Sequence, residues 1–306
     1  MITKIHIPNV LKQDDLQCFT EIFIIIPFIS QSLYNSIIKK ANWWNEGLFT
    51  KLFFNNPIFN SASLLECDIV CIPFKYSPTD IRINTICNDA QKYNKKVVAF
   101  YNDDSIETFK LPDNLYLFRT SVNKSSLLIN ERVFPAFVPD HSSINNILNA
   151  SNVTKSVGFC GHSEGIRSNI LNKCYNILGA ENCNFIIRPT FYHHTGQVNI
   201  KTRREYLTSI SNNLFTLCIR GAGNFSYRFY EALCVGRIPI LIDTDTALPF
   251  ENIIDWKQYI IKIKENEIDQ LPAIINNCKI KTTDIRRMWE EYLSPEGYTK
   301  NFYRDI

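Results

Sequence analysis

The sequence predicts an α/β protein built on parallel sheets, and two observations support this. Short apolar runs alternate with segments of helical periodicity along most of the 306 residues, which is typical of strand–helix–strand units. Several runs, such as "IVCIPF" and "KVVAFY", are continuously apolar rather than alternating. Such strands are buried on both faces, as in parallel sheets that helices cover.

Ten runs predict strands. In chain order they are Lys4 to Ile7, Ile22 to Phe28, Asp68 to Phe74, Lys96 to Tyr101, Leu115 to Arg119, Ser156 to Cys160, Asn184 to Arg188, Leu214 to Ile219, Arg237 to Ile242 and Tyr259 to Lys264. Helical periodicity lies between them, at Gln31 to Ala41, Thr79 to Tyr93, Glu164 to Leu178, Arg203 to Asn212, Ser226 to Val235 and Ile268 to Asn277.

A polar stretch rich in Asn and Ser, "VPDHSSINNILNASNVTKS" from Val138 to Ser156, separates two similar series of strands. We therefore expect two Rossmann-like domains, at residues 1–150 and 151–282. The last segment, residues 283–306, predicts one or two amphipathic helices that pack back across the domains.

Composition excludes several classes of protein. The chain is 45% hydrophobic and 21% charged, which indicates a globular protein rather than a disordered one. Its net charge of +3 is too small to predict a nucleic-acid partner. Of the ten cysteines, several lie inside apolar runs, and none has the spacing of a metal site, so we expect reduced thiols.

The longest apolar run is "IFIIIPFI", at residues 22–29. It is too short to cross a bilayer, and it lacks the basic flank of a signal peptide. We therefore expect a cytoplasmic protein without a transmembrane segment.

One stretch predicts an anion site. After the strand that ends near Ile219, the loop "RGAGNF" leads into a helix that starts at Ser226. The first N–H groups of a helix are unpaired and carry partial positive charge, and Gly221 and Gly223 let the backbone approach a ligand closely. Ser226 suits either a helix cap or a hydrogen bond to phosphate.

The charged side chains of this stretch suit a nucleoside diphosphate. Arg220 and Arg228 flank the turn and could clamp phosphate oxygens. Glu231 lies one helical turn after Arg228 and could accept hydrogen bonds from ribose hydroxyls. The alternative is a surface ion pair between Arg228 and Glu231. A second alternative is a dinucleotide fingerprint that lacks its third glycine, with Asp243 on the ribose.

The stretch "FTLCIRGAGNFSYRFYEALCVGRIPILIDTDTALPFENIIDW" resembles the signature of exostosin-type glycosyltransferases, which form glycosyltransferase family 47. The ordered matches are Cys218, Arg220, Gly221, Ser226, Arg228, Glu231, Ala232, Ile238, Pro239, Asp243, Leu248, Pro249, Phe250, Asp255 and Trp256. A further segment, "FCGHSEGIRSNIL", is similar to the start of the family's donor-binding domain, and it adds Gly161, His162 and Arg167 as donor-binding candidates. The N-terminal half shows a weaker likeness at "NNPIFNSASLLECDIVCIPF".

The resemblance implies a GT-B architecture, in which two Rossmann-like domains face a cleft. It implies an inverting, metal-independent transfer from a nucleotide sugar, most simply a UDP-sugar, with no other cofactor. By the match, Arg220, Ser226 and Arg228 hold the diphosphate, and Glu231 holds the ribose. The chain departs from the family at Ile219, where a proline is usual, and at Arg237, where a small residue or cysteine is usual.

The implied partners are a nucleotide sugar and a glycan acceptor. Because eukaryotic relatives carry a membrane anchor and this chain shows none, we expect an enzyme of bacterial or viral surface-glycan synthesis, with peripheral association to a lipid-linked acceptor as an option.

An inverting transfer needs a general base for the acceptor hydroxyl. Asp103 and Asp104 follow the strand "KVVAFY", and Asp80 follows "CIPFKYSPT", so all three are candidates at strand ends of the N-terminal half. The alternative for each is a solvated turn or helix-cap aspartate.

Two other features carry less weight. His193 and His194 are adjacent, so their side chains point apart and do not predict a metal site. The residues "NWW" at 42–44 suit a sugar-stacking surface, although aromatic side chains are more often core.

Two competing functions remain open. An oxidoreductase would use Gly221, Gly223 and Asp243 for NAD(P), and stabilisation by NAD(H) without stabilisation by UDP would favour it. A non-catalytic protein would bind a nucleotide or a glycan without transferring sugar.

Overall fold

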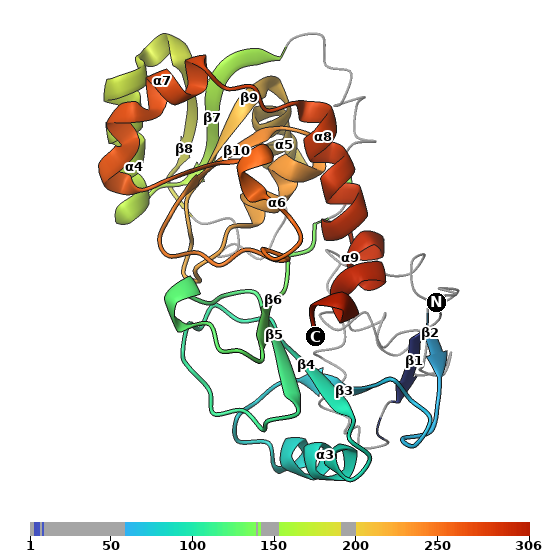
Figure 1. Cartoon of the computed structure of the whole chain (residues 1–306). Helices are drawn as coiled ribbons and strands as arrows, with labels where there is room; N and C mark the ends of the chain where they lie inside the picture. The colour runs from blue at the N-terminus through green and yellow to red at the C-terminus, as the bar shows by residue number, and fades with distance from the viewer. Residues whose placement is uncertain (1–2, 7, 9–58, 139, 142–152, 191–199) are drawn as a thin grey trace. The chain divides into compact units, whose positions relative to one another are not determined.

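The structure is a computed structural model, and it describes residues 3–6, 8, 59–138, 140–141, 153–190 and 200–306 (Figure 1). The chain divides into two compact units. Unit 1 comprises Met1–Pro135, Ala247–Pro249 and Tyr298–Ile306, and unit 2 comprises Ala136–Thr246 and Phe250–Gly297.

Unit 1 contains a parallel sheet in the order β2-β1-β3-β4-β5-β6. Its strands are β1 Thr3–His6, β2 Phe59–Ser61, β3 Ile69–Lys75, β4 Lys96–Tyr101, β5 Leu115–Arg119 and β6 Glu131–Val133, and its helix α3 spans Ile81–Gln91. Val97, Val98 and Ala99 of β4 are all fully buried, so adjacent residues of one strand face two covered sides of the sheet. The continuous apolar run of β4 is therefore buried on both faces of the sheet, as the sequence predicted.

Unit 2 contains a second parallel sheet, in the order β11-β10-β9-β7-β8. Its strands are β7 Thr154–His162, β8 Cys183–Arg188, β9 Asn213–Cys218, β10 Ile238–Ile242 and β11 Ile261–Ile263. Its helices are α4 Ile166–Leu178, α5 Ile200–Asn212, α6 Tyr227–Cys234 and α7 Leu271–Asn276. Figure 1 shows α4 and α7 on one side of this sheet and α5 and α6 on the other, as in a doubly wound fold.

The C-terminal segment is helical, as expected. Helix α8 Thr282–Met288 runs into a π-helical turn at Trp289–Leu293, and α9 Pro295–Asn301 is followed by a 3-10 turn at Phe302–Asp305. Other 3-10 turns lie at Lys124–Ser126, Ala180–Asn182, Trp256–Gln258 and Glu265–Gln270. Tyr298 and Phe302 are fully buried and stack at 6.0 Å between ring centroids; both also contact Phe118, and all three residues belong to unit 1.

The prediction of an α/β protein with parallel sheets is confirmed, and each predicted strand and helix that falls on described residues overlaps an observed one. The predicted strand at Ile22 to Phe28, the predicted helix at Gln31 to Ala41 and the "NWW" segment lie outside the described residues. Strands β2 and β6 were missed, because "FNS" and "ERV" are three residues each and neither is an apolar run.

Most of the described cysteines are core side chains. The nine cysteines within the described ranges are free, and seven of them are buried. Burial raises the pKa of Cys71, Cys87, Cys174, Cys218 and Cys234 to about 12 each, so these thiols are uncharged small core side chains. In the part of the chain that the structure describes, no helix is both long and apolar enough to cross a membrane.

Candidate functional site

The predicted donor-binding residues of unit 2 gather where the strand order of the sheet reverses. Strand β7 is followed in the chain by β8 on one side and by β9 on the other. The crevice outside the carboxyl ends of such strands is where open α/β sheets bind ligands. Gly161 and His162 end β7, and Arg220 follows β9, so the sequence-predicted residues lie at this point.

Arg228 is the central side chain of the site. Helix α6 begins at Tyr227, one residue after the predicted start at Ser226, and places the Arg228 guanidinium 4.2 Å from the ring centroid of Phe159 and 5.6 Å from that of Tyr206. Its Nη2 donates to the carbonyl oxygen of Cys160 at 2.7 Å. A Cβ atom on Gly161 would lie 2.8 Å from the same Nη2, so a side chain there would displace the guanidinium from this position.

The charge of Arg228 is buried but not neutralised by the protein. The residue is only 7% exposed, and its Nε has no hydrogen-bond partner. No carboxylate among the described residues forms an ion pair with it. A buried charge without a counter-ion is costly, so the site is prepared for an anionic ligand.

A second guanidinium lies beside the first. Arg167 of α4 donates from Nε to the carbonyl oxygen of Arg220 at 3.0 Å and from Nη1 to that of His162 at 3.4 Å. Burial and the neighbouring positive charge of Arg228 lower the pKa of Arg167 to about 10. A Cβ on Gly221 would meet Arg167 Nη2 at 3.4 Å, so this arginine also borders the glycine loop.

The remaining donor-binding candidates flank this pair. Ser226 adopts the N-cap conformation of α6, with φ −145° and ψ 121°, but its side chain makes no capping hydrogen bond. Arg220 is half-buried and makes no hydrogen bond or ion pair through its side chain within the described ranges, while Gly223 is buried in the loop. His162 is held by Arg188 O at 3.2 Å from Nδ1 and by Glu164 Oε2 at 3.1 Å from Nε2.

Glu231 lies deeper than the sequence indicated. It is 3% exposed, and Arg203 Nη2 donates to its Oε1 at 2.9 Å, while the Tyr206 hydroxyl donates to Oε2. His141 Nε2 lies 3.7 Å from Oε1. The alternative of a surface ion pair between Arg228 and Glu231 is therefore wrong, because both side chains are buried and the carboxylate pairs with Arg203 instead.

These partners keep Glu231 ionised. Burial alone would raise its pKa, but His141, Arg203 and Tyr206 outweigh burial and lower the pKa of Glu231 to about 2. Burial and the neighbouring Glu231 raise the pKa of Tyr206 well above its usual value, so the phenol stays a donor. The ribose role of Glu231 stays a prediction, and it requires ribose hydroxyls to bind a carboxylate that three side chains already engage.

Sequence reasoning missed the three partners of Glu231. His141 precedes Glu231 in the chain by 90 positions, and Arg203 and Tyr206 lie on α5, which is polar enough to be taken for a surface helix. Tyr206 is one helical turn after Arg203, and its ring lies 5.2 Å from the Arg203 guanidinium. The spacing indicates that Arg203 and Tyr206 lie on one face of the helix, but it does not indicate that this face lies against Glu231.

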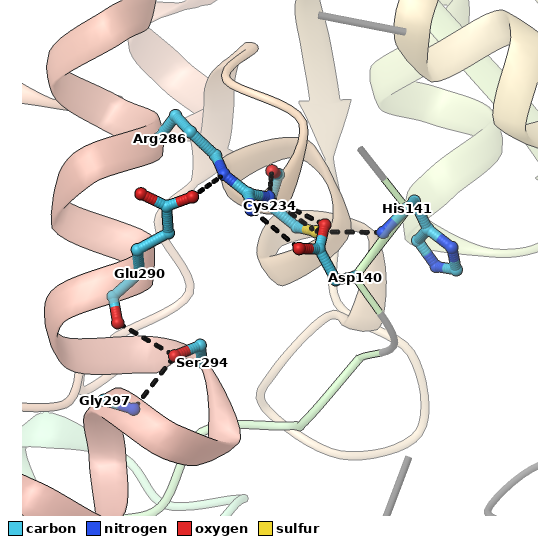
Figure 2. Close-up of polar contacts among 7 residues, drawn as sticks. All are labelled: Asp140, His141, Cys234, Arg286, Glu290, Ser294 and Gly297. Carbon is cyan, nitrogen blue, oxygen red and sulfur yellow. Dashed lines mark hydrogen bonds and ion pairs between the residues drawn. The ribbon is translucent and has the colours of Figure 1, made fainter. Parts of the chain in front are cut away.

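The C-terminal end of α6 is held by two further arginines. Figure 2 shows Arg286, on α8, between Asp140 and Cys234: Nη1 and Nη2 donate to the two Asp140 oxygens at 2.9 and 2.7 Å, and Nη1 also donates to the Cys234 carbonyl at 2.5 Å. Arg237 is 4% exposed and donates to the carbonyls of Ser211 and Val235, at the ends of α5 and α6. Arg237, at a position where the family usually has a small residue or cysteine, thus connects the ends of α5 and α6 by hydrogen bonds.

The turn after β10 bears on the dinucleotide alternative. Asp243 Oδ1 accepts from the N–H groups of Asp245 and Thr246 at 3.0 and 3.3 Å, and it lies 3.3 Å from Lys262 Nζ. The Asp243 carboxylate therefore stabilises the turn in which it lies. An open hollow of about 660 Å³ lies beside this turn, lined by Lys173, Asp243, Asp245, Lys264, Glu265 and Asn266, and it shares no lining residue with the arginine pair.

The three candidate bases of unit 1 have different surroundings. Asp103 accepts from Lys75 Nζ at 3.1 Å and from the Ser105 N–H at 3.0 Å. Partial burial would raise its pKa, but these two donors lower it overall, which makes Asp103 a weaker proton acceptor.

Asp80 caps α3 by accepting from the Arg82 N–H at 3.0 Å, and its carboxylate also pairs with the Arg82 guanidinium. The helix-cap alternative is thus confirmed for Asp80. Asp104 is exposed, and its side chain makes no hydrogen bond with any described residue.

In the described ranges, no three His, Cys, Asp or Glu side chains are placed to hold a metal ion. His193 and His194 lie outside these ranges.

Comparison with known proteins agrees with the geometry. Residues 131–278 match the family model of the exostosin GT47 domain. The chain is similar to Exostosin-1 of Drosophila melanogaster, with 38% identity over 95 residues, which covers 29% of this chain and 12% of that protein.

Two other relatives give similar matches. The Exostosin-1 homolog of Caenorhabditis elegans is 34% identical over 96 residues, covering 30% of this chain and 25% of that protein. The probable glucuronosyltransferase GUT1 of Oryza sativa subsp. japonica is 32% identical over 74 residues, covering 24% and 18%. The matched part is therefore at most a quarter of these relatives' length.

Proposed function

We propose that this protein, whose residues 131–278 match the exostosin GT47 family model, transfers a sugar from a UDP-sugar to a hydroxyl of a glycan acceptor. The proposed reaction inverts the anomeric centre and needs no metal ion. The two units act as the halves of a GT-B enzyme: unit 2 binds the donor, and unit 1 binds the acceptor. The products are glycans of a surface polysaccharide or glycoconjugate.

The observation that carries the proposal is the pair of guanidiniums at the glycine loop. Arg228 is buried without a carboxylate partner, and Arg167 is close enough for the charge of Arg228 to lower its pKa. Two like charges at one point favour a ligand with at least two negative charges, such as a diphosphate.

The same charges suit the chemistry. The bond between the anomeric carbon and the β-phosphate oxygen breaks as the acceptor hydroxyl attacks, and negative charge grows on the departing UDP. Fixed positive charge in a buried site stabilises that growing charge without reorganisation. The acceptor proton passes to a general base, which we place at the carboxyl edge of the unit 1 sheet.

Titration calorimetry with UDP, in the presence of excess EDTA, tests the donor site. We expect UDP to bind, and we expect the same affinity when EDTA is replaced by magnesium. Loss of binding in EDTA would contradict metal independence. Binding of NAD(H) in place of UDP would contradict the whole proposal and favour the oxidoreductase alternative.

A further inference from the structure

We propose that Asn224 is the positioning residue that holds the glycine loop, Arg220 to Ser226, in the conformation that receives the donor diphosphate; this inference rests on the proposed function. Asn224 is 1% exposed, and its side chain hydrogen-bonds to the turn that follows β10. It therefore acts through the loop and not on the ligand.

All the hydrogen-bonding capacity of the Asn224 amide is used. Its Nδ2 donates to the carbonyl oxygens of Thr244 and Asp245 at 3.0 and 3.3 Å. Its Oδ1 accepts from the hydroxyls of Thr244 and Thr246 at 2.6 and 3.1 Å. A buried amide can make two donations and accept twice, so this side chain is fully satisfied by one partner segment.

The partner segment is itself rigid. Asp243 Oδ1 accepts from two N–H groups of the turn, and Lys262 Nζ donates to the Thr246 carbonyl at 3.0 Å while pairing with Asp243. Asp245 has a φ of 63°, a left-handed conformation that such bonds must hold in place. The turn is thus a fixed platform at the end of β10.

The loop has little structure of its own. Its sequence from Gly221 to Gly223 is Gly-Ala-Gly, which is conformationally permissive. The backbone hydrogen bond that closes it, from the Gly221 N–H to the Phe225 carbonyl, is long at 3.4 Å. Asn224 therefore supplies the order that the glycines lack, and it lowers the entropy that the ligand must remove on binding.

The test compares Asn224→Asp with a matched buried amide. Asn224→Asp keeps the size and the acceptor oxygen, but it removes both N–H donations and places negative charge against two carbonyl oxygens. The control is Asn213→Asp, because Asn213 is fully buried and bonded at the opposite, amino end of β9, to Ser209 O at 2.5 Å and Ser156 Oγ at 2.6 Å.

We expect Asn224→Asp to weaken UDP binding at least tenfold, with a larger entropic penalty by calorimetry. Hydrogen exchange of the loop amides in ligand-free protein should be at least tenfold faster than in the parent. Asn213→Asp should lower the melting temperature while UDP affinity and loop exchange stay within about twofold of the parent. Asn224→Ala repeats the test without the added charge.

The outcomes distinguish failure of the proposed function from failure of the positioning role of Asn224. A parent protein that does not bind UDP overturns the proposed function, whatever the loop does. A parent that binds UDP, with Asn224 variants that bind it equally or whose loop amides exchange at the parental rate, overturns the positioning role alone. Equal loss of UDP binding in Asn213→Asp would also overturn it, because the effect would then be general destabilisation.

Discussion

At the scale of single residues, one arginine explains several features of the sequence that otherwise look unrelated. The Arg228 guanidinium lies against the Phe159 ring, donates to the Cys160 carbonyl and occupies the space that a Gly161 side chain would take. Three consecutive residues at the end of β7 are therefore matched to one side chain on α6. These contacts fix the position of the Arg228 guanidinium charge.

Replacing Arg228 should weaken donor binding. We expect Arg228→Ala to reduce the affinity for UDP by about 1.5–3 kcal/mol, the range for a hydrogen bond to a charged group. Calorimetry at a temperature well below unfolding measures it. Arg204→Ala, on exposed α5 surface, is the control. Unchanged UDP affinity in folded Arg228→Ala would mean that the guanidinium serves only packing.

Glu231 should make stability depend on pH. Its pKa is about 2 in the folded protein and 4.5 in the unfolded chain, so it stabilises the fold fully above pH 4.5, and this contribution is lost as pH falls towards 2. A shift of this size corresponds to about 3 kcal/mol.

We therefore expect Glu231→Gln to be less stable than the parent at pH 7, with the difference in unfolding free energy less than half as large at pH 3. Urea unfolding at both pH values measures it. A difference that does not change with pH would show that the carboxylate charge is not what stabilises this position.

At the scale of elements, helix α6 is fixed at both ends. Its first turn carries Arg228, and its last carbonyls receive Arg286 and Arg237. Arginines at the C-terminal end of a helix satisfy unpaired carbonyls and match the negative end of the helix dipole. Farther along, the Ser294 hydroxyl closes the bend before α9 by donating to Glu290 O and accepting from the Gly297 N–H, both at 2.9 Å (Figure 2).

Removing the Arg286 contacts should destabilise unit 2. We expect Arg286→Gln to cost about 1–2 kcal/mol of unfolding free energy, because Asp140 is half-exposed and water replaces part of the interaction. Arg287→Gln is the matched control, since Arg287 is adjacent but exposed and pairs with Asp284, whose side chain is 40% exposed. A control that costs as much as Arg286→Gln would contradict the assignment.

At the scale of the whole molecule, the proposal divides the chemistry between two sheets. Every donor-binding candidate belongs to unit 2, and every candidate base belongs to unit 1. Asp103→Asn should therefore leave UDP affinity within about twofold of the parent and reduce sugar transfer at least about a hundredfold, since a general base contributes 10²–10⁴. Transfer is measured with a UDP-sugar and an acceptor found by screening glycans.

Asp104→Asn and Asp80→Asn complete the series. Asp103 is the candidate whose role as a base is hardest to reconcile with its surroundings, because its neighbours lower its pKa. Asp104, in contrast, is an exposed carboxylate. Turnover close to the parental value in a variant eliminates that residue. Parental turnover in all three places the base elsewhere in the protein.

Local sequence determined the parallel sheets and the start of α6. A run such as "KVVAFY" carries its own evidence of burial on both faces, and the order strand, glycine loop, helix predicts the anion site without distant residues. The exostosin likeness lies in the same continuous stretch, so the sequence alone carries it.

Tertiary structure alone decided which charges remain available. Arg228 and Glu231 look equivalent in the sequence, one helical turn apart, yet the Glu231 carboxylate pairs with Arg203 and is contacted by His141 and Tyr206, while Arg228 is left with a carbonyl and two aromatic rings. Those partners come from distant parts of the chain, so no local pattern indicates them. A charge becomes a binding group only when the fold buries it and supplies no counter-ion, and that depends on long-range packing.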